Sequence, residues 1–275
     1  MSEWTDIIDG LADHLALLKE LGTRSVEVEP AVIRALAARS GAAAAPLPAA
    51  VPAPPARPAV AAPPAAAPPV ARPGATRVLT LDQRRQELAA IAARAEACET
   101  CVLRRQRNRC VPGQGNPLSP DVMFIGEAPG ADEDRAGEAF VGAAGHLLTK
   151  MITAMGYTRD DIFIANICKC RPPGNRTPEA AEMAACWPYL ERQIALLKPK
   201  VIVLLGKVAV HAVLRDDKPL GGMRGKPYEF AGIPVVVTYH PAYLLRNLPD
   251  KAKAWEDLLF ARRILRERAA PELPF

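Results

Sequence analysis

Neither a signal peptide nor a membrane-spanning segment is expected from the sequence. Residues 1–6 have no basic stretch followed by an apolar one, and no apolar run approaches the roughly 20 residues that span a bilayer. We therefore expect a soluble, cytoplasmic protein with no membrane partner, and we expect it to be a monomer.

Charge of one sign is not in large excess either. The chain has 35 Lys and Arg residues against 30 Asp and Glu residues, which gives a formal net charge of +5. This excess favours an anionic partner, but many enzymes that never bind nucleic acid carry as much. Charge alone therefore leaves the partner open.

Disulfides are not expected, although the chain has six cysteines. In a reducing compartment, cysteines are more often free thiols or metal ligands than disulfide partners. Cys98 and Cys101 form a close pair, and the others are Cys110, Cys168, Cys170 and Cys186. Separated groups of thiols can hold a zinc ion or an iron–sulfur cluster, and their spacing does not distinguish these two from each other or from buried thiols.

Composition divides the chain into four parts. Residues 1–40 carry apolar side chains at helical spacing, which predicts a helical N-terminal extension. Residues 41–76 consist mostly of Ala, Pro and Val and hold 11 of the 28 prolines, so we expect an extended, disordered linker. Residues 77–268 form the expected folded domain, and residues 269–275 form a short tail.

Four apolar runs in the folded domain predict buried strands. They span residues 122–125, 162–167, 201–205 and 233–238. Helices are expected between them, as well as at 79–97, opened by Thr80 and Asp82, and at 251–268. Strands that alternate with helices predict a three-layer α/β/α fold around a mainly parallel, four-stranded sheet, with ligand groups at the carboxyl ends of the strands.

A glycine-containing loop follows the first predicted strand. Its residues are Gly126-Glu127-Ala128-Pro129-Gly130, and three acidic residues come soon after it. The loop lacks the Lys-Ser/Thr of a P-loop, and carboxylates repel phosphate, so a phosphate site is not expected. A carboxylate that orients a water molecule suits these residues better, and a plain tight turn is the alternative.

Five motifs occur in a fixed order along the chain. They are Cys98-x2-Cys101, the loop at 126–130, the Asn166 to Arg176 segment, Cys186, and His240-Pro241-Ala242-Tyr243-Leu244-Leu245-Arg246. As a set they resemble the family 4, iron–sulfur uracil-DNA glycosylases over roughly residues 85–265. The resemblance implies an enzyme that flips uracil out of DNA and hydrolyses its N-glycosidic bond, leaving an abasic site. No Schiff-base lysine is evident, so a monofunctional glycosylase is expected.

The resemblance also implies a cofactor. It makes Cys98, Cys101, Cys170 and Cys186 the ligands of a [4Fe-4S] cluster and leaves Cys110 and Cys168 without a ligand role. We expect the cluster to fasten the first helix to the loop after the second strand and to take no part in the chemistry.

The resemblance implies roles in the pocket. Glu127 would position the attacking water, and His240 would donate a hydrogen bond to uracil O2 as negative charge develops there. The amide of Asn166 would donate to O4 and accept from N3–H, a pattern that rejects cytosine. Phe140 would stack on the base, and Glu133 would lie near C5 and help to exclude thymine.

One position departs from the wider superfamily. Many of its members outside this branch have a catalytic Asp where this chain has Ala128. Ala128 is then a pocket residue without a carboxylate, and Glu127 takes the catalytic role by proximity and by family analogy.

DNA contacts are expected at the last motif. Leu244 and Leu245 would form a wedge that fills the gap left by the flipped base, and Arg246 would contact phosphate. Further candidates for phosphate contacts are Arg176, Lys169, Arg171 and Arg224, and solvated surface charge is the alternative for each.

Other functions remain open on the sequence. A related glycosylase could act on other deaminated bases, and a non-enzymatic iron–sulfur protein could bind DNA or a polymerase. The presence together of Glu127, Asn166 and His240 disfavours a pure binding module, which needs none of them. A repair or replication protein is the expected partner of residues 1–40.

Overall fold

The structure, a computed structural model, describes residues 79–269. The predicted N-terminal extension and linker, and the tail beyond residue 269, lie outside the described residues. Within the described part, no helix is both long and apolar enough to cross a membrane.

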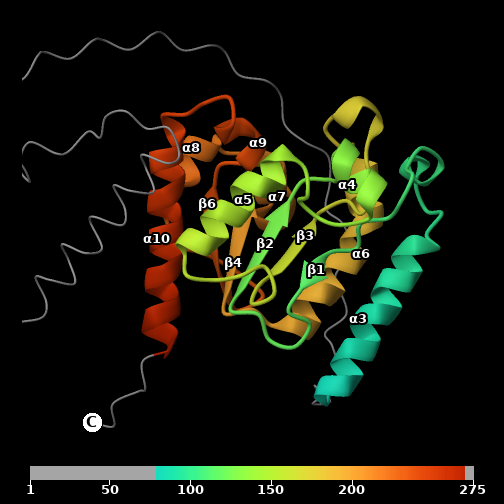
Figure 1. The fold of residues 1–275 in the computed structure, drawn as a ribbon, viewed down its shortest axis with the longest axis horizontal. Helices are drawn as coiled ribbons and strands as arrows, with labels where there is room; N and C mark the ends of the chain where they lie inside the picture. Colours follow the sequence, from blue (N-terminus) through green and yellow to red (C-terminus); the bar gives the residue numbers. More distant parts are fainter. Residues whose placement is uncertain (1–78, 270–275) are drawn as a thin grey trace, which may run out of the picture. The chain divides into compact units, whose positions relative to one another are not determined.

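A six-stranded sheet forms the centre of the fold (Figure 1). Its order is β1-β3-β2-β4-β6-β5. The strands are β1 (Gln114–Gly115), β2 (Val122–Gly126), β3 (Phe163–Asn166), β4 (Val201–Leu205), β5 (Tyr228–Phe230) and β6 (Ile233–Thr238). The four inner strands are parallel, and β1 and β5 pair antiparallel at the two edges.

Helices cover both faces of this sheet. They are α3 (Leu81–Glu96), α4 (Ala131–Ala136), α5 (Ala143–Ala154), α6 (Ala180–Leu197), α7 (Lys207–Leu214), α8 (Leu220–Met223), α9 (Pro241–Leu244) and α10 (Asp250–Ala269), with short 3-10 turns η1 (Val102–Arg105) and η2 (Pro173–Asn175). In Figure 1, α5 and α10 lie on one side of the sheet, and α6 lies on the other with α3 beyond it. The predicted three-layer α/β/α fold is confirmed.

Side-chain alternation along the strands explains the two cores. In β2, Val122 and Phe124 pack with α5 and α10, whereas Met123 and Ile125 pack with α6 and α7. Every residue of β2, β3 and β4 is buried because both faces of a parallel sheet are covered by helices. The continuous apolar runs in the sequence are the direct consequence.

The first described helix begins as its sequence predicts. Thr80 caps α3: its Oγ1 accepts from Gln83 N at 3.3 Å, and its own N–H donates to Gln83 Oε1 at 3.0 Å. This reciprocal pair satisfies two amides that the first turn of a helix leaves without partners.

The sheet has two more strands than predicted. β1 and β5 contain only two and three residues, and β5 is incompletely buried, so neither produces an apolar run. Both form because the edge of the inner sheet offers unpaired backbone groups to any neighbouring segment.

The chain reverses direction across the sheet at β2. From β2 it moves to β3 on one side and later returns to β4 on the other. Loops diverge at such a switch point, so a cleft forms at the carboxyl ends of the strands there. The predicted site residues after β2 and β3 lie at this end.

Candidate functional site

A cleft of about 600 Å³ opens at the carboxyl ends of the inner strands. It brings together predicted site residues that are far apart in sequence. Those that line it are Glu127, Ala128, Glu133, Phe140, Asn166, Arg176, His240, Leu245 and Arg246. Leu244 does not line the cleft.

Asn166 is the last residue of β3, and the residue is 1% exposed. Neither its Oδ1 nor its Nδ2 has a hydrogen-bond partner among the described residues. Burying an amide without partners costs about 1–3 kcal/mol. Such a group is therefore expected to be paired in another state of the molecule, through a ligand in the cleft.

Gly126 faces Asn166 in the register of β2 and β3. A Cβ at Gly126 would lie 2.4 Å from Asn166 Oδ1 and 2.6 Å from Phe140 Cζ. Only glycine allows the strand backbone, the amide and the aromatic ring to meet at this point.

Phe140 lies beside this amide in an uncommon backbone conformation, with φ +54°. Such a conformation costs a non-glycine residue about 1–3 kcal/mol. Arg159 holds the segment, because it donates to Phe140 O at 3.2 Å and to Ala139 O at 2.6 Å. The ring of Phe140 is 5.6 Å from the ring of His240, at an interplanar angle of 34°. One face of the cleft is therefore an aromatic platform.

His240 precedes α9 and caps it. Its Nδ1 accepts a hydrogen bond from Ala242 N at 3.1 Å, which assigns the proton of the neutral ring to Nε2. Burial lowers the pKa of His240 to about 4. At neutral pH this side chain is thus an uncharged donor through Nε2.

Glu127 follows β2 at the edge of the cleft. Burial raises the pKa of its carboxyl group, and a hydrogen bond from the Thr177 side chain opposes that rise. Thr177 also lines the cleft, and no sequence motif pointed to it. Ala128, next to Glu127, lines the cleft with a methyl group and packs against the core.

Glu133 has a structural task that its sequence position did not indicate. Its carboxylate accepts from the backbone N–H groups of Gly130, Val141 and Gly142, at 3.0, 2.9 and 2.9 Å. Three donors around one carboxylate hold two loops of the cleft wall together. The predicted place near uracil C5 remains a prediction.

The two leucines of the last motif have different environments. Leu245 is 42% exposed at the cleft, whereas Leu244 is 1% exposed and packs between α5 and α10. The prediction that both leucines form the wedge is therefore wrong for Leu244, which is buried. α9 is a single turn with one face on the core, and Leu244 lies on that face.

The four further candidates for phosphate contacts all have other partners, and one of them, Arg171, donates through Nε to Asn175 Oδ1 at 2.8 Å. Arg176 pairs with Glu182 through two hydrogen bonds of 2.8 and 2.6 Å, and Arg224 pairs with Asp257 at 2.7 Å and covers the Tyr239 ring. Lys169 is 1% exposed and cannot reach phosphate. Its assignment as a phosphate contact is wrong. Arg246 is exposed, and no ion pair of Arg246 occurs in residues 79–269.

The predicted cluster cysteines come from three segments. Cys98 and Cys101 follow α3, Cys170 follows β3, and Cys186 lies in α6. The Cys101 thiol is within electrostatic reach of the other three. The described residues contain no group of three or more His, Cys, Asp or Glu side chains arranged to hold a single metal ion.

The surroundings of Cys170 and Cys186 favour thiolates. A hydrogen bond from Cys110 and another from Arg107 lower the pKa of Cys170 to about 7. Contact with Cys168, together with the backbone N–H of Lys169, lowers the pKa of Cys186 to about 6. Four cysteines, two of which accept hydrogen bonds at sulfur, are a donor set that fits a [4Fe-4S] cluster.

Cys110 and Cys168 are both buried. Hydrogen bonding to Cys170 raises the pKa of Cys110, and hydrogen bonding to Cys186 raises that of Cys168. The two residues are thus neutral thiols in contact with the predicted ligands. No sequence motif pointed to Arg107, because it lies in the run Arg104-Arg105-Gln106-Arg107-Asn108-Arg109, which resembles surface charge.

Known proteins resemble this chain in the same region. Residues 112–259 match the model of the uracil DNA glycosylase superfamily. A type-4 uracil-DNA glycosylase of Pyrobaculum aerophilum is 46% identical over 169 residues, which cover 58% of this chain and 86% of the relative. That of Thermotoga maritima is 40% identical over 188 residues, or 66% of this chain and 97% of the relative. A type-5 uracil-DNA glycosylase of P. aerophilum is 34% identical over 159 residues, or 50% of this chain and 68% of the relative.

Proposed function

Because the chain belongs to the uracil-DNA glycosylase superfamily, and within it to the type-4 enzymes, we propose how its cleft recognises uracil and breaks the N-glycosidic bond. The protein is a uracil-DNA glycosylase that acts on uracil-containing DNA. Different residues of the cleft recognise the base, stabilise the leaving group and position the water molecule.

The unpartnered amide of Asn166 is the observation that carries the assignment. Uracil offers an acceptor at O4 and a donor at N3–H. An amide can pair with both, through Nδ2 and Oδ1. Cytosine has the opposite pattern at these atoms and would leave two buried groups unpaired. Phe140 supplies a surface on which the flipped base stacks.

His240 stabilises the leaving group. As the bond between C1′ of the sugar and N1 of uracil breaks, its electron pair passes to the base, and negative charge reaches O2. A neutral imidazole with its proton on Nε2 donates to that oxygen and needs no prior proton uptake.

Glu127 acts on the sugar side. Its carboxylate positions a water molecule for attack on C1′ and stabilises positive charge on the oxocarbenium-like sugar. Thr177 orients this carboxylate through its hydroxyl group. The products are free uracil and an abasic site.

Leu245 and Arg246 engage the duplex. Leu245 is the exposed apolar residue at the cleft, so it enters the base stack as the target nucleotide leaves. Arg246 contacts phosphate next to it.

Cys98, Cys101, Cys170 and Cys186 would hold a [4Fe-4S] cluster. With the cluster bound, these four cysteines would fasten the end of α3 to the β3–α6 connection and to α6. Asn166 ends the strand that leads to Cys170, so this attachment supports the base pocket.

The catalytic unit comprises residues 77–268, and residues 1–40 tether a repair or replication protein through the linker 41–76. A chain that starts at Val78 should therefore fold and excise uracil at the rate of the full chain. Loss of excision on this truncation would place the N-terminal residues in the catalytic unit.

Matched oligonucleotides with a single U, T, C or hypoxanthine test the function. After incubation with purified protein, alkali should cleave the strand at U and not at T or C. The Asn166→Ala variant is the control for a contaminating glycosylase. Cleavage at hypoxanthine in preference to U would assign the cleft to a different deaminated base.

A further inference from the structure

Two cationic side chains are buried beside the cysteines. The side chain of Arg107 is 2% exposed, and Lys169 as a residue is 1% exposed. A buried cation is normally paired with a carboxylate, because the loss of its hydration costs several kcal/mol. The side chains of these two cations instead contact backbone carbonyls, an amide oxygen and a cysteine sulfur.

The side chain of Lys169 makes its contacts with neutral groups. Its Nζ donates to Asn166 O at 2.9 Å and to Gln193 Oε1 at 2.8 Å, and its backbone N–H donates to Cys186 Sγ at 3.3 Å. No carboxylate of residues 79–269 pairs with this ammonium group.

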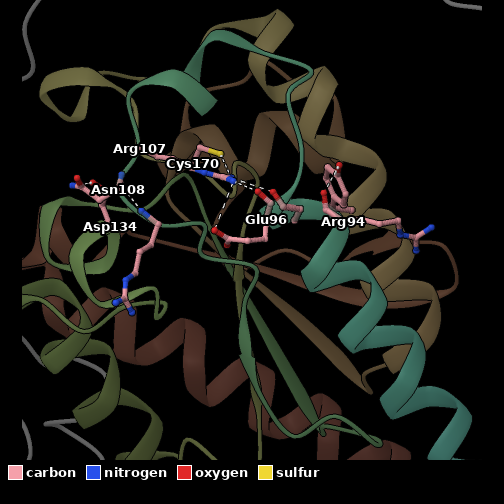
Figure 2. A network of polar contacts seen from close by, with 9 residues as sticks. Arg94, Glu96, Arg107, Asn108, Asp134 and Cys170 are labelled. Carbon is pink, nitrogen blue, oxygen red and sulfur yellow. Dashed lines mark hydrogen bonds and ion pairs between the residues drawn. The ribbon is translucent and has the colours of Figure 1, made fainter.

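Arg107 is also buried next to a cysteine, with its guanidinium beside Cys170 (Figure 2). Its guanidinium donates to Cys170 Sγ at 3.0 Å, to Ala95 O at 3.1 Å and to Glu96 O. Its nearest carboxylate oxygen is Glu96 Oε1 at 4.0 Å, on a side chain that is 63% exposed. Water screens such a pair, so it compensates little of the buried charge.

A third buried cation shows the usual arrangement. Arg224 is 11% exposed at its side chain, and its Nε lies 2.7 Å from the buried carboxylate of Asp257. Arg107 and Lys169 lack such a carboxylate, and both act electrostatically on Cys186. The counter-charge for both must therefore come from the cysteine site.

We propose that Arg107 and Lys169 are the counter-charges of the cysteine-bound cluster and set its reduction potential. The inference rests on the proposed [4Fe-4S] group. A [4Fe-4S]²⁺ core with four thiolates has a net charge of −2, which two buried cations neutralise. Addition of one electron gives −3, and nearby cations stabilise this more negative state.

Both residues are positioning residues that act on the cluster through charge and through hydrogen bonds to sulfur. Lys169 has a second consequence. Its backbone N–H donates to Cys186 and its ammonium group donates to the carbonyl of Asn166, so one residue connects the cluster to the residue that reads the base.

The experiment uses the full-length, iron-loaded protein. Arg107→Gln and Lys169→Met remove the charges, Arg107→Lys keeps one, and Arg224→Gln is the control that removes a buried cation whose partner is the carboxylate of Asp257. We measure iron and sulfide per chain, the midpoint potential of the one-electron couple with an added chemical reductant, and the rate of iron transfer to a chelator.

We expect both neutral variants to shift the midpoint potential to more negative values and to release iron several-fold faster. Arg107→Lys should keep a potential near that of the wild type. Arg224→Gln should lower thermal stability without a shift in potential. Unchanged potentials and release rates in both neutral variants would overturn the inference.

A variant that does not fold leaves the test intact. If Arg107→Gln or Lys169→Met gives no loaded protein, Arg107→Lys and Lys169→Arg decide. Normal iron content in these charged variants would support the proposal that positive charge balances the cluster. Iron loss as severe as in the neutral variants would overturn it, because the shape of the side chain and not its charge would then be required. Wild-type protein that excises uracil but contains no iron would instead refute the proposed cluster itself.

Discussion

The cleft and the cysteine site lie on either side of the end of β3, and their buried polar groups are unsatisfied in different ways. In the cleft, Asn166 carries no charge and lacks hydrogen-bond partners. Beside the cysteines, Lys169 and Arg107 have hydrogen bonds but lack a carboxylate counter-charge. The first deficit suits a neutral, polar base, and the second suits an anionic cluster.

The two sites also differ in whether their ligand exchanges or stays bound. The base has to enter and leave, so its hydrogen-bond partners must be free in the unliganded protein. A resident cofactor can be built into the core and can hold backbone segments for the life of the molecule. Substitutions at the cysteines should therefore impair folding, whereas substitution of Asn166, whose amide has no hydrogen-bond partner among the described residues, should impair activity alone.

The largest effect is expected from the cluster ligands. Replacement of any one ligand should abolish normal iron content and greatly lower the yield of folded protein; the variants are Cys98→Ser, Cys101→Ser, Cys170→Ser and Cys186→Ser. Without one thiolate the cluster loses a ligand, and without the cluster the buried cations lose their negative counter-charge. Metal analysis and visible absorption of the purified protein provide the measurement. Cys110→Ser and Cys168→Ser are the matched controls, and they should retain iron. Stoichiometric zinc without iron in the wild type would contradict the cluster assignment.

Asn166→Ala should have the next largest effect, on activity alone. Two hydrogen bonds to the base, each worth about 1–3 kcal/mol, predict a loss of roughly 10²- to 10⁴-fold in single-turnover excision of uracil. Thermal stability should not fall, because the amide has no hydrogen-bond partner among the described residues. A clear drop in melting temperature with near-normal excision would make Asn166 a structural residue.

Asn166→Asp gives a sharper test of base preference. A carboxyl group can accept from the cytosine amino group and, when protonated, can donate to its N3. This variant should lose uracil excision and gain trace activity on cytosine. An unchanged ratio of the two activities would move base recognition to Phe140 and the backbone.

Glu127→Gln should separate chemistry from binding. The substitution keeps size and removes charge, so the excision rate should fall about 10²-fold or more while affinity for uracil-containing DNA stays nearly constant. Rapid-quench kinetics and a binding titration distinguish the two. An equal loss in rate and affinity would mean that Glu127 contributes to binding and not specifically to the transition state.

The excision rate should fall at acid pH in two steps, one for the protonation of Glu127 and one for that of His240. Burial raises the pKa of Glu127, so as pH falls the carboxylate is protonated above its ordinary value of 4.5, and excision declines. His240 has a pKa of about 4, below its ordinary value of 6.5, so its neutral form persists until the pH is lower still. In Glu127→Gln the residual rate should therefore stay flat down to about pH 4.

The lowered pKa of His240 also makes the stability of the folded protein fall as the pH falls. The unfolded chain takes up a proton on this residue near pH 6.5, whereas the folded protein resists until about pH 4. Its contribution to stability is therefore constant above pH 6.5 and is lost as the pH falls from 6.5 to 4.

A residual excision rate of Glu127→Gln that declines already near pH 6 would show that the His240 pKa is not depressed.

Much of the fold could be predicted because it depends on local patterns. The strands at 201–205 and 233–238 have the bounds that their apolar runs predict, and Thr80 begins α3. The candidate pocket residues could be placed because strand ends carry them and the family resemblance orders them. β1 and β5 could not be predicted, since two or three residues carry no pattern and form strands only against a neighbour.

Burial of charge could not be predicted from sequence. Lys169 lies in a loop with Arg171 and Pro172, which is typical of an exposed basic segment, yet tertiary packing encloses it. The same limit applies to Arg107 and to the contacts of Glu133 with three backbone amides. Each of these depends on segments that are distant along the chain and meet only in the folded domain.

The adjacent leucines of the last motif provide the smallest effect and the cleanest internal control. Leu245 is exposed at the cleft, so Leu245→Ala should leave stability unchanged and weaken excision from duplex DNA several-fold, with little effect on single-stranded DNA. Only a duplex leaves a gap in the base stack for a side chain to fill. Leu244 is buried, so Leu244→Ala should lower the free energy of unfolding by about 2–5 kcal/mol, and any loss of activity should be alike on both substrates. Equal losses on duplex and single-stranded substrate for Leu245→Ala would remove it as the wedge and would leave the exposed Tyr243 and Leu248 as the apolar residues to test next.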